Sequence, residues 1–441
     1  MRTPIDDFVR AYAASDRLRM HMPGHKGAGD VEAFDLTEVQ GADSLYEAEG
    51  IIRESEENAS TLFGAHTFYS AEGSSLCIRA MLYLAQLWAA REGKPLRVAA
   101  GRNAHKTFLS AVALLGAEVD WLSPPGESYL ACPLTAEYVK TWLREHSATA
   151  LYLTSPDYLG NTVDVGAIAT VCRKHGVLLL VDNAHGAYLK FLPVSRHPMD
   201  LGADLCCDSA HKTLPALTGA AYLHVSKAAP DTLRTHAKAA MALFGSTSPS
   251  YLILASLDRV NRYLSEGYGE RLAAFGAQKA ALEEALVSHG FVTAGNEPLK
   301  LTVLPKSYGY TGTELAEYLR GRGIEPEFCD PDHLVLMLSP ERSADLAPLR
   351  AALLSLPRKA PRSTQPPRLA ALPQAVLTPR EAILSPDEYL PAEACVGRVL
   401  ASLTVGCPPA VPILVSGERI EPEHLPLFAY YGVTHLRVVK A

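Results

Sequence analysis

The apolar run at residues 176–182, GVLLLVD, constrains the fold most strongly. Its apolar residues follow one another without the alternation of a strand that has one face in water. This pattern is typical of a parallel strand covered by helices on both faces. Open α/β sheets of this kind bind ligands in the crevice at the carboxyl ends of their strands. Asp182 ends the run, so this acid is either a ligand-binding residue or a turn or N-cap aspartate.

A second stretch places a lysine between two apolar strands. We expect strands at residues 205–207 and 220–225, and the turn after the first strand reads Asp-Ser-Ala-His-Lys-Thr. Most lysines are solvated surface charges, but burial makes available the neutral amine that condenses with aldehydes. A carboxylate and a lysine on two strands suggest pyridoxal phosphate, with Asp182 bound to the pyridinium nitrogen and Lys212 to the aldehyde.

The segment Ser209-Ala210-His211-Lys212 resembles the cofactor-lysine motif of the bacterial ornithine/lysine/arginine decarboxylases. These are pyridoxal phosphate enzymes of the aspartate-aminotransferase fold (fold type I). Further segments match in the same order: HMPGHKG at 21–27, GADSL at 41–45, EGII at 49–52, CPPAVP at 407–412 and Gly417-Glu418. The resemblance covers nearly the whole chain. It implies an α/β large domain with a mostly parallel sheet, a smaller α/β domain and a C-terminal α+β domain.

The resemblance also implies chemical roles for individual residues. Lys212 would bind the cofactor's aldehyde, Asp182 would hold its ring nitrogen, and His105 would stack on the ring and help return a proton. The other cofactor-binding residues that the match implies are His185, Ser74, Ser75, Ser209, His211 and Ser246. Ser246 would reach the phosphate of the neighbouring subunit, so each site would need two chains.

Residue chemistry supports part of this set and leaves alternatives open. Gly73, Ser74 and Ser75 precede an apolar helix, where free N–H groups and hydroxyls favour a phosphate. Ordinary N-capping explains one of the serines equally well. His105 follows a strand and can be a capping or packing residue, while His185 can be an inert loop histidine.

The match extends to the substrate. Glu327, in GIEPE at residues 323–327, would meet the distal cation of a basic amino acid, with Glu325 as the solvated alternative. The loop around Ser246 can instead be the N-cap box of the helix that follows it.

Two segments depart from the family pattern. The family usually has Asn-Gly-Thr/Ser-Ser before this helix, and Ala71-Glu72 before Gly73 is a departure from it. An acid beside a phosphate is unfavourable, so Glu72 should point away or contact substrate. Cys407 and Ala410 replace a tyrosine and a glycine of the family, which puts the local backbone and any role of that tyrosine in doubt.

Composition places the chain among ordinary globular proteins. A chain of 441 residues is long enough to bury a large core. Its residues are 48% apolar and 20% charged, as in ordinary globular proteins. The net charge of −7 gives no electrostatic case for nucleic acid binding, and no apolar run reaches the length of a membrane span. The eight cysteines form no CxxC pair. We therefore expect a cytoplasmic protein with reduced thiols and no metal site.

The expected elements divide the chain into five parts. These are an N-terminal arm at residues 1–40, a large cofactor-binding domain at 41–260, a small α/β domain at 261–356, a proline-rich linker at 357–374 and a C-terminal decarboxylase domain at 375–441.

The resulting hypothesis is a pyridoxal-phosphate-dependent carboxy-lyase (EC 4.1.1). It would convert arginine, lysine or ornithine to the corresponding amine and carbon dioxide, in polyamine metabolism, as a homodimer or a higher homo-oligomer. The first alternative is another enzyme of the same cofactor class: an aminotransferase, an aldolase or an α-oxoamine synthase. The second is a regulatory relative that has lost catalysis, which the substitutions at Glu72 and Cys407 would support.

Overall fold

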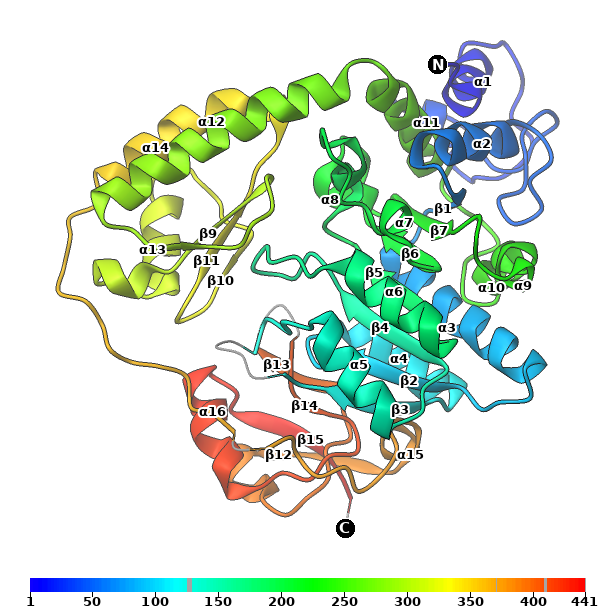
Figure 1. The fold of residues 1–441 in the computed structure, drawn as a ribbon. Helices are drawn as coiled ribbons and strands as arrows, with labels where there is room; N and C mark the ends of the chain where they lie inside the picture. The colour runs from blue at the N-terminus through cyan, green and yellow to red at the C-terminus, as the bar shows by residue number, and fades with distance from the viewer. Residues whose placement is uncertain (125–128, 370, 408–410, 441) are drawn as a thin grey trace. The chain divides into compact units, whose positions relative to one another are not determined.

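The computed structural model describes residues 1–124, 129–369, 371–407 and 411–440 (Figure 1). Residues 408–410 of the expected CPPAVP motif lie outside the described residues. The chain divides into two compact units, and each is described by itself. The first comprises Met1–Arg97, Thr135–Ser155 and Asp164–Leu272, and the second comprises Val98–Leu134, Pro156–Val163 and Ala273–Ala441.

The strands of the first unit lie in the order β1-β7-β6-β5-β4. They span His66–Ser70 (β1), Ala150–Thr154 (β4), Leu178–Asp182 (β5), Leu205–Asp208 (β6) and Ala221–Val225 (β7). β4, β5 and β6 are parallel, whereas β7 is antiparallel to both of its neighbours. Every residue of β5, β6 and β7 is buried, which confirms the interpretation of the continuous apolar runs as covered strands.

Helices pack on these strands. α3 (Gly73–Arg91) contacts β6 and β7, and α6 (Val165–His175) contacts β5 and α5 (Ala136–Glu145). The other helices of this unit are α1 (Pro4–Ala13), α2 (Ile51–Phe63), α7 (Pro198–Leu201), α8 (Ala210–Thr213), α9 (Asp231–Thr235), α10 (Ala237–Ala242) and α11 (Tyr251–Ser265), and α12 (Tyr268–His289) begins here. α3 buries side chains on several faces because it is apolar nearly all round.

The family-like motifs GADSL and EGII meet at the start of α2. The Asp43 carboxylate accepts hydrogen bonds from the N–H groups of Gly50 at 2.8 Å and Ile52 at 3.1 Å. The first N–H groups of a helix have no partner within the helix, and an acid near them also complements the helix dipole. These two motifs therefore have a structural role that is independent of any ligand.

Asp258 of α11 fixes the N-terminal helix in the same way. Its Oδ2 accepts hydrogen bonds from the N–H groups of Ile5 at 2.8 Å and Asp6 at 3.0 Å. Burial raises the pKa of Asp258 to about 6, above its ordinary value.

A pH-dependent stability difference follows from this raised pKa. Between the unfolded pKa of about 4 and the folded pKa of about 6, the folded state binds more protons than the unfolded state, so stability falls as pH rises through this window. We expect the melting temperature of the wild type, relative to that of Asp258→Asn, to fall between about pH 4.5 and 6.5 and then level off. Thermal melts at stepped pH test this expectation, and a constant difference would contradict it.

The second unit contains an antiparallel sheet in the order β10-β11-β9-β8. Its strands are Thr293–Ala294 (β8), Lys300–Val303 (β9), Phe328–Cys329 (β10) and Leu334–Met337 (β11). Helices α13 (Gly312–Arg320) and α14 (Leu346–Leu354) share a core with this sheet and with the end of α12. The unit also holds β2 (Arg97–Gly101), whose first residue belongs to the other unit, α4 (Lys106–Leu115) and β3 (Glu118–Leu122).

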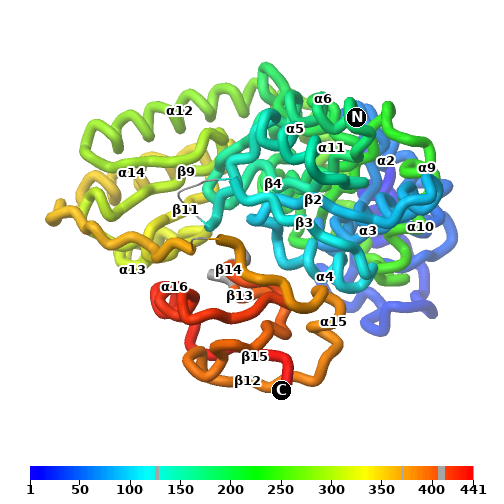
Figure 2. Tube along the Cα trace, turned by 60° about the horizontal axis from the view of Figure 1, so that its bottom comes forward, coloured from blue at the N-terminus to red at the C-terminus, as the bar shows by residue number. Residues whose placement is uncertain are grey.

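The C-terminal part of the second unit has its own core, and Figure 2 shows its strands beside α16 (Leu425–Tyr430). Its elements are α15 (Pro379–Leu384), the pair β12 (Asp387–Pro391) and β15 (His435–Val439), and the pair β13 (Thr404–Cys407) and β14 (Val411–Val415). Arg102 binds Glu418 through two hydrogen bonds of 2.8 Å. Gly417 has φ +90°, and a Cβ there would lie 2.1 Å from the Leu377 carbonyl oxygen, so the Gly417-Glu418 motif is explained by packing and an ion pair.

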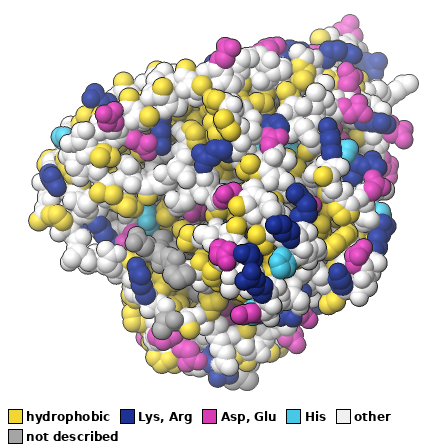
Figure 3. Space-filling model, in the orientation of Figure 1, with side chains coloured by type: hydrophobic (Ala, Val, Ile, Leu, Met, Phe, Trp, Pro, Cys, Tyr) yellow, Lys and Arg dark blue, Asp and Glu magenta, His cyan; other side chains and the backbone are white. Residues whose placement is uncertain are grey.

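Basic and acidic side chains are interspersed over the face seen in Figure 3, in keeping with the small net charge. The helices within the described ranges include none that is long and apolar enough to cross a bilayer. Cys77, Cys132, Cys172, Cys206, Cys207, Cys329 and Cys395 are free thiols.

Candidate active site

The carboxyl ends of β4, β5 and β6 meet at one edge of the sheet. The parallel register pairs Thr154 with Asp182 and Asp182 with Cys207. The Asn183 N–H donates to the Cys207 carbonyl at 3.0 Å, so the loops that leave β5 and β6 start side by side. This is the position at which open α/β sheets bind ligands.

Asp182 is almost fully buried at the end of β5, with 2% of its surface exposed. Its Oδ2 accepts a hydrogen bond from the Tyr152 hydroxyl at 2.9 Å, and its Oδ1 accepts one from the Ala184 N–H at 3.1 Å. The bond from Ala184 is a turn interaction, so the turn interpretation of this acid has a counterpart in the structure. A carboxylate accepts about four hydrogen bonds, so these contacts leave capacity for a further donor.

Tyr152 was not identified from the sequence, because it lies in an apolar strand and gives no polar signal there. Burial, and then the charge of Asp182, raises the pKa of the Tyr152 phenol well above its ordinary value. The phenol therefore stays protonated and donates to Asp182, which orients the carboxylate.

Lys212 lies in the short helix α8, and its Nζ is 3.1 Å from Nε2 of His185. His185 is 95% buried, since 5% of its surface is exposed, and it belongs to the loop that follows Asp182. The structure thus brings together two of the expected cofactor-binding residues from the loops after β5 and β6.

Ser209 and Ser74 are also in contact, although 135 residues separate them. Ser209 is buried, and its hydroxyl donates to the Ser74 hydroxyl at 2.8 Å. Ser74 and Ser75 both lie in the first turn of α3, whose N-cap residue is Glu72. The segment that carries Lys212, residues 209–213, is termed the lysine loop. The first turn of the 19-residue helix α3 therefore adjoins the lysine loop, as expected for a helix that binds a phosphate at its N-terminus.

His211 points back to the start of β7. Its Nδ1 lies 2.9 Å from the Ala220 carbonyl oxygen, and its own N–H donates to the same oxygen at 3.2 Å. Burial lowers the pKa of His211, so the neutral ring that donates through Nδ1 is favoured. His211 thereby fixes the conformation of the loop that carries Lys212.

Glu72 accepts a hydrogen bond from the Ser246 N–H at 2.5 Å. The acid that departs from the family pattern is thus held by the loop expected to reach a neighbouring subunit. The Ser246 hydroxyl in turn accepts from the Ser248 N–H at 3.1 Å.

The two remaining site residues lie in the second unit. His105 is the N-cap of α4, and its Nδ1 accepts from the Thr107 N–H at 3.2 Å, so the capping interpretation has a counterpart in the structure. Glu327 is exposed, and its Oε1 accepts from the Tyr158 hydroxyl at 2.9 Å. The alternative, Glu325, forms an ion pair with Arg320 at 2.7 Å.

The side chains of the first unit fit pyridoxal phosphate chemically. They offer an amine that can bind an aldehyde, a buried carboxylate with spare acceptor capacity for a ring N–H, and hydroxyls at a helix N-terminus for a phosphate.

Known proteins resemble this chain over nearly its whole length. The family model described as Orn/Lys/Arg decarboxylase, major domain, matches residues 3–289, and the model of the C-terminal domain matches residues 363–436. The chain is 31% identical to an arginine decarboxylase of Halalkalibacterium halodurans, over 96% of this chain and 92% of that protein. It is 29% identical to an arginine decarboxylase of Bacillus subtilis over the same shares of the two chains.

The fold matches the crystal structure of a lysine decarboxylase of Francisella novicida with a TM-score of 0.80. This match has 15% identity and covers 99% of this chain and 81% of that one. The predicted fold class, fold type I with a mostly parallel sheet, is confirmed. The chain belongs to the Orn/Lys/Arg decarboxylase family.

Proposed function

We propose that this protein is a pyridoxal-phosphate-dependent decarboxylase that converts a basic amino acid to its amine and carbon dioxide. The observation that carries this proposal is the Lys212 amine, 3.1 Å from the His185 imidazole, on loops at the ends of two parallel strands. Membership of a decarboxylase family supports the reaction type. A cytoplasmic enzyme of polyamine metabolism is the setting that this proposal implies.

Bound pyridoxal phosphate supplies an acceptor for the electron pair that is released when carbon dioxide leaves. Lys212 would bind the aldehyde, and Asp182 would keep a proton on the ring nitrogen. The Tyr152 hydroxyl and the Ala184 N–H hold the Asp182 carboxylate in place for this contact with the ring nitrogen. Lys212 or His105 would be the group that returns a proton to Cα, and His185 would be the partner of the ring's phenolic oxygen.

The serines and His211 shape the rest of the site. Ser74, Ser75 and Ser209 are proposed to bind the phosphate, which the N-terminal end of α3 also attracts. His211 holds the lysine loop against β7 through the Ala220 carbonyl.

Ser246 is proposed to reach the phosphate of a second subunit, which makes a homodimer the smallest active form. Mass measurement in solution tests this assembly. Mixing Ser246→Ala, which should bind the cofactor more weakly, with the inactive Lys212→Ala tests whether sites are shared, because hybrid dimers would then hold one site with both wild-type residues.

Glu327 is the proposed partner of the substrate's distal cation. The Tyr158 hydroxyl donates to one oxygen of Glu327, and the Tyr158 ring packs edge-on against Phe328 with centroids 5.3 Å apart, so packing holds the donor of this hydrogen bond. The arginine decarboxylases among the relatives make arginine the first substrate to assay, followed by lysine and ornithine.

We expect Glu327→Gln to raise KM for the basic substrate by roughly tenfold to a hundredfold, with a smaller change in kcat. The reason is the loss of a charged partner for the substrate cation. Glu325→Gln is the matched control, because its carboxylate pairs with Arg320 instead, and its KM should stay near that of the wild type. Steady-state kinetics of both variants decide this, and equal KM values in both would contradict the assignment.

Product analysis tests the function as a whole. The protein is incubated with pyridoxal phosphate and, separately, with arginine, lysine and ornithine. We expect equimolar carbon dioxide and agmatine or diamine from one of them, and no keto acid. Keto acid without gas would instead indicate an aminotransferase of the same fold. Cofactor binding without any reaction would indicate the regulatory relative.

A further inference from the structure

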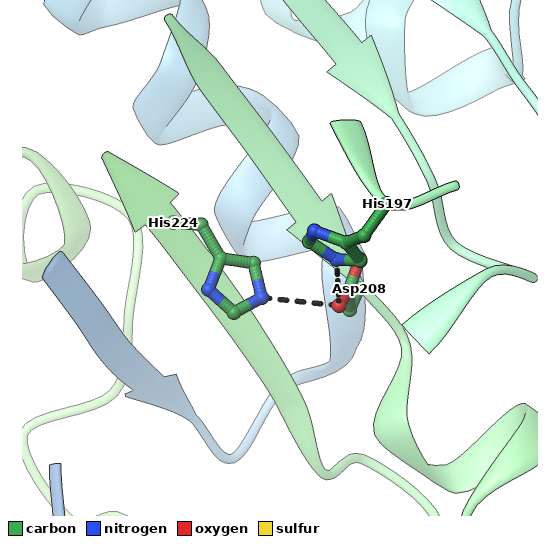
Figure 4. Close-up of side chains that lie close together, drawn as sticks. All are labelled: His197, Asp208 and His224. Carbon is green, nitrogen blue, oxygen red and sulfur yellow. Dashed lines mark hydrogen bonds and ion pairs between the residues drawn. The ribbon is translucent and has the colours of Figure 1, made fainter. Parts of the chain in front are cut away.

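Asp208, the residue just before the lysine loop, is the centre of a buried hydrogen-bond network. Its Oδ2 lies 2.9 Å from Nε2 of His197 and 3.0 Å from Nε2 of His224, as Figure 4 shows. Its Oδ1 accepts a hydrogen bond from the Asn183 amide at 2.7 Å. The side chains of Asp208 and both histidines have 0% of their surface exposed. A buried carboxylate is costly unless donors surround it, and here two imidazoles, one amide and the Cys206 thiol, at 3.7 Å from Oδ1, do so.

The proton positions of the two histidines follow from their other contacts. Nδ1 of His197 accepts from the Met199 N–H at 3.3 Å, so a neutral ring carries its proton on Nε2, toward Asp208. Nδ1 of His224 lies 2.9 Å from the Thr67 hydroxyl, which can donate to it. Burial lowers the pKa of His224 and so favours its neutral form. Both Nε2–H groups therefore donate to one carboxylate oxygen.

The same three groups resemble a metal-ligand set, since their ligand atoms lie within 4.8 Å of one another. A metal bound to Nε2 of His197 would force the proton onto Nδ1, where it would face the Met199 N–H, a second donor. The contacts of His197 thus favour a hydrogen-bond network over a metal centre.

The network joins the two loops of the candidate active site. Asp208 ends β6 and is followed directly by Ser209, and Lys212 lies four residues after Asp208. Asn183 directly follows Asp182, and its N–H also binds the Cys207 carbonyl at 3.0 Å. The Asn183–Asp208 bond therefore ties the loop of the proposed ring-nitrogen partner to the loop of the proposed cofactor lysine.

We propose that Asp208 is a positioning residue that, through Asn183, sets the spacing between Asp182 and Lys212. This role rests on the proposed use of pyridoxal phosphate. His197 and His224 hold Oδ2 of Asp208 while Asn183 holds Oδ1, so contacts to both oxygens fix the orientation of the carboxylate. A displacement of either loop would separate the groups that must hold one small ring.

The test compares Asp208→Asn with Asp204→Asn. Asp204 lies at the opposite end of β6 and accepts from the Leu179 N–H at 2.8 Å, so it also links β6 to β5 but stands away from the lysine loop. For each protein we measure the melting temperature, the dissociation constant for pyridoxal phosphate, and the pH midpoint of the absorbance of the bound cofactor.

We expect Asp208→Asn to weaken cofactor binding by about tenfold or more, the factor for one lost hydrogen bond to a charged group, and to displace the pH midpoint. Asp204→Asn should lower the melting temperature and leave both cofactor readouts near wild type. Asn183→Ala serves if Asp208→Asn does not fold, and it should change the same two cofactor readouts.

Wild-type affinity and midpoint in Asp208→Asn or Asn183→Ala would overturn the positioning role. So would equal losses in the Asp204→Asn control. Wild-type protein that binds pyridoxal phosphate but decarboxylates none of the three amino acids would refute the proposed reaction alone, because the comparison of variants still holds. Wild-type protein that binds no cofactor would overturn both.

Discussion

Replacing Lys212 with alanine should abolish turnover completely and remove the absorbance band of the lysine-bound cofactor. A primary amine can condense with the aldehyde, whereas the imidazole of His185, whose Nε2 lies 3.1 Å from Nζ, cannot replace it in that bond. Lys212→Arg should behave in the same way, because a guanidinium keeps the charge but is not nucleophilic.

Lys174→Ala is the matched control for these variants, since Lys174 is exposed in the last turn of α6, which precedes the amino end of β5 and not its carboxyl end. It should retain the band and the rate of the wild type. Absorbance scans and a carbon dioxide release assay measure both quantities. Retained turnover in Lys212→Ala would rule out its proposed role.

Replacing Asp182 with asparagine should leave cofactor binding in place and slow turnover by at least about a hundredfold, the order that such groups contribute. A carboxylate close to the ring nitrogen raises the pKa of that nitrogen by about 1–3 units, and a neutral amide does not. Without that proton the ring is a poorer acceptor for the electrons of the broken bond.

Asp164→Asn is the control for this variant, because Asp164 is the N-cap of α6 and asparagine is an equally good N-cap residue. Its rate should match that of the wild type. Single-turnover kinetics with saturating cofactor separate binding from the chemical step. A near-wild-type rate for Asp182→Asn would contradict the assignment of this acid.

The central strands were predictable because their signal is local. A continuous apolar run has no solvent-facing side, so residues 176–182 could be placed as a covered parallel strand, and β5 is found at Leu178–Asp182. The fold class followed from this run and from family-like motifs in order. The division into domains at residues 40, 260, 356 and 374 stays a prediction.

Contacts between distant residues were not predictable from the sequence. His197 lies 11 residues before Asp208 and His224 lies 16 after it, and they converge only because β7 pairs antiparallel with β6 and α7 packs on β6. Glu72 and Ser246 are 174 residues apart. The sequence therefore shows that Glu72 departs from the family pattern, but not that it accepts a hydrogen bond from the Ser246 N–H. The choice among arginine, lysine and ornithine depends on the length of a cavity, which is likewise a tertiary property.

The most direct measurement is to reduce the cofactor-loaded protein with borohydride, digest it and locate the added mass by mass spectrometry. We expect the pyridoxyl phosphate mass on the peptide that contains Lys212, and on no other lysine peptide. The mass on a different lysine, or unmodified Lys212 in protein that has taken up the cofactor, would contradict it.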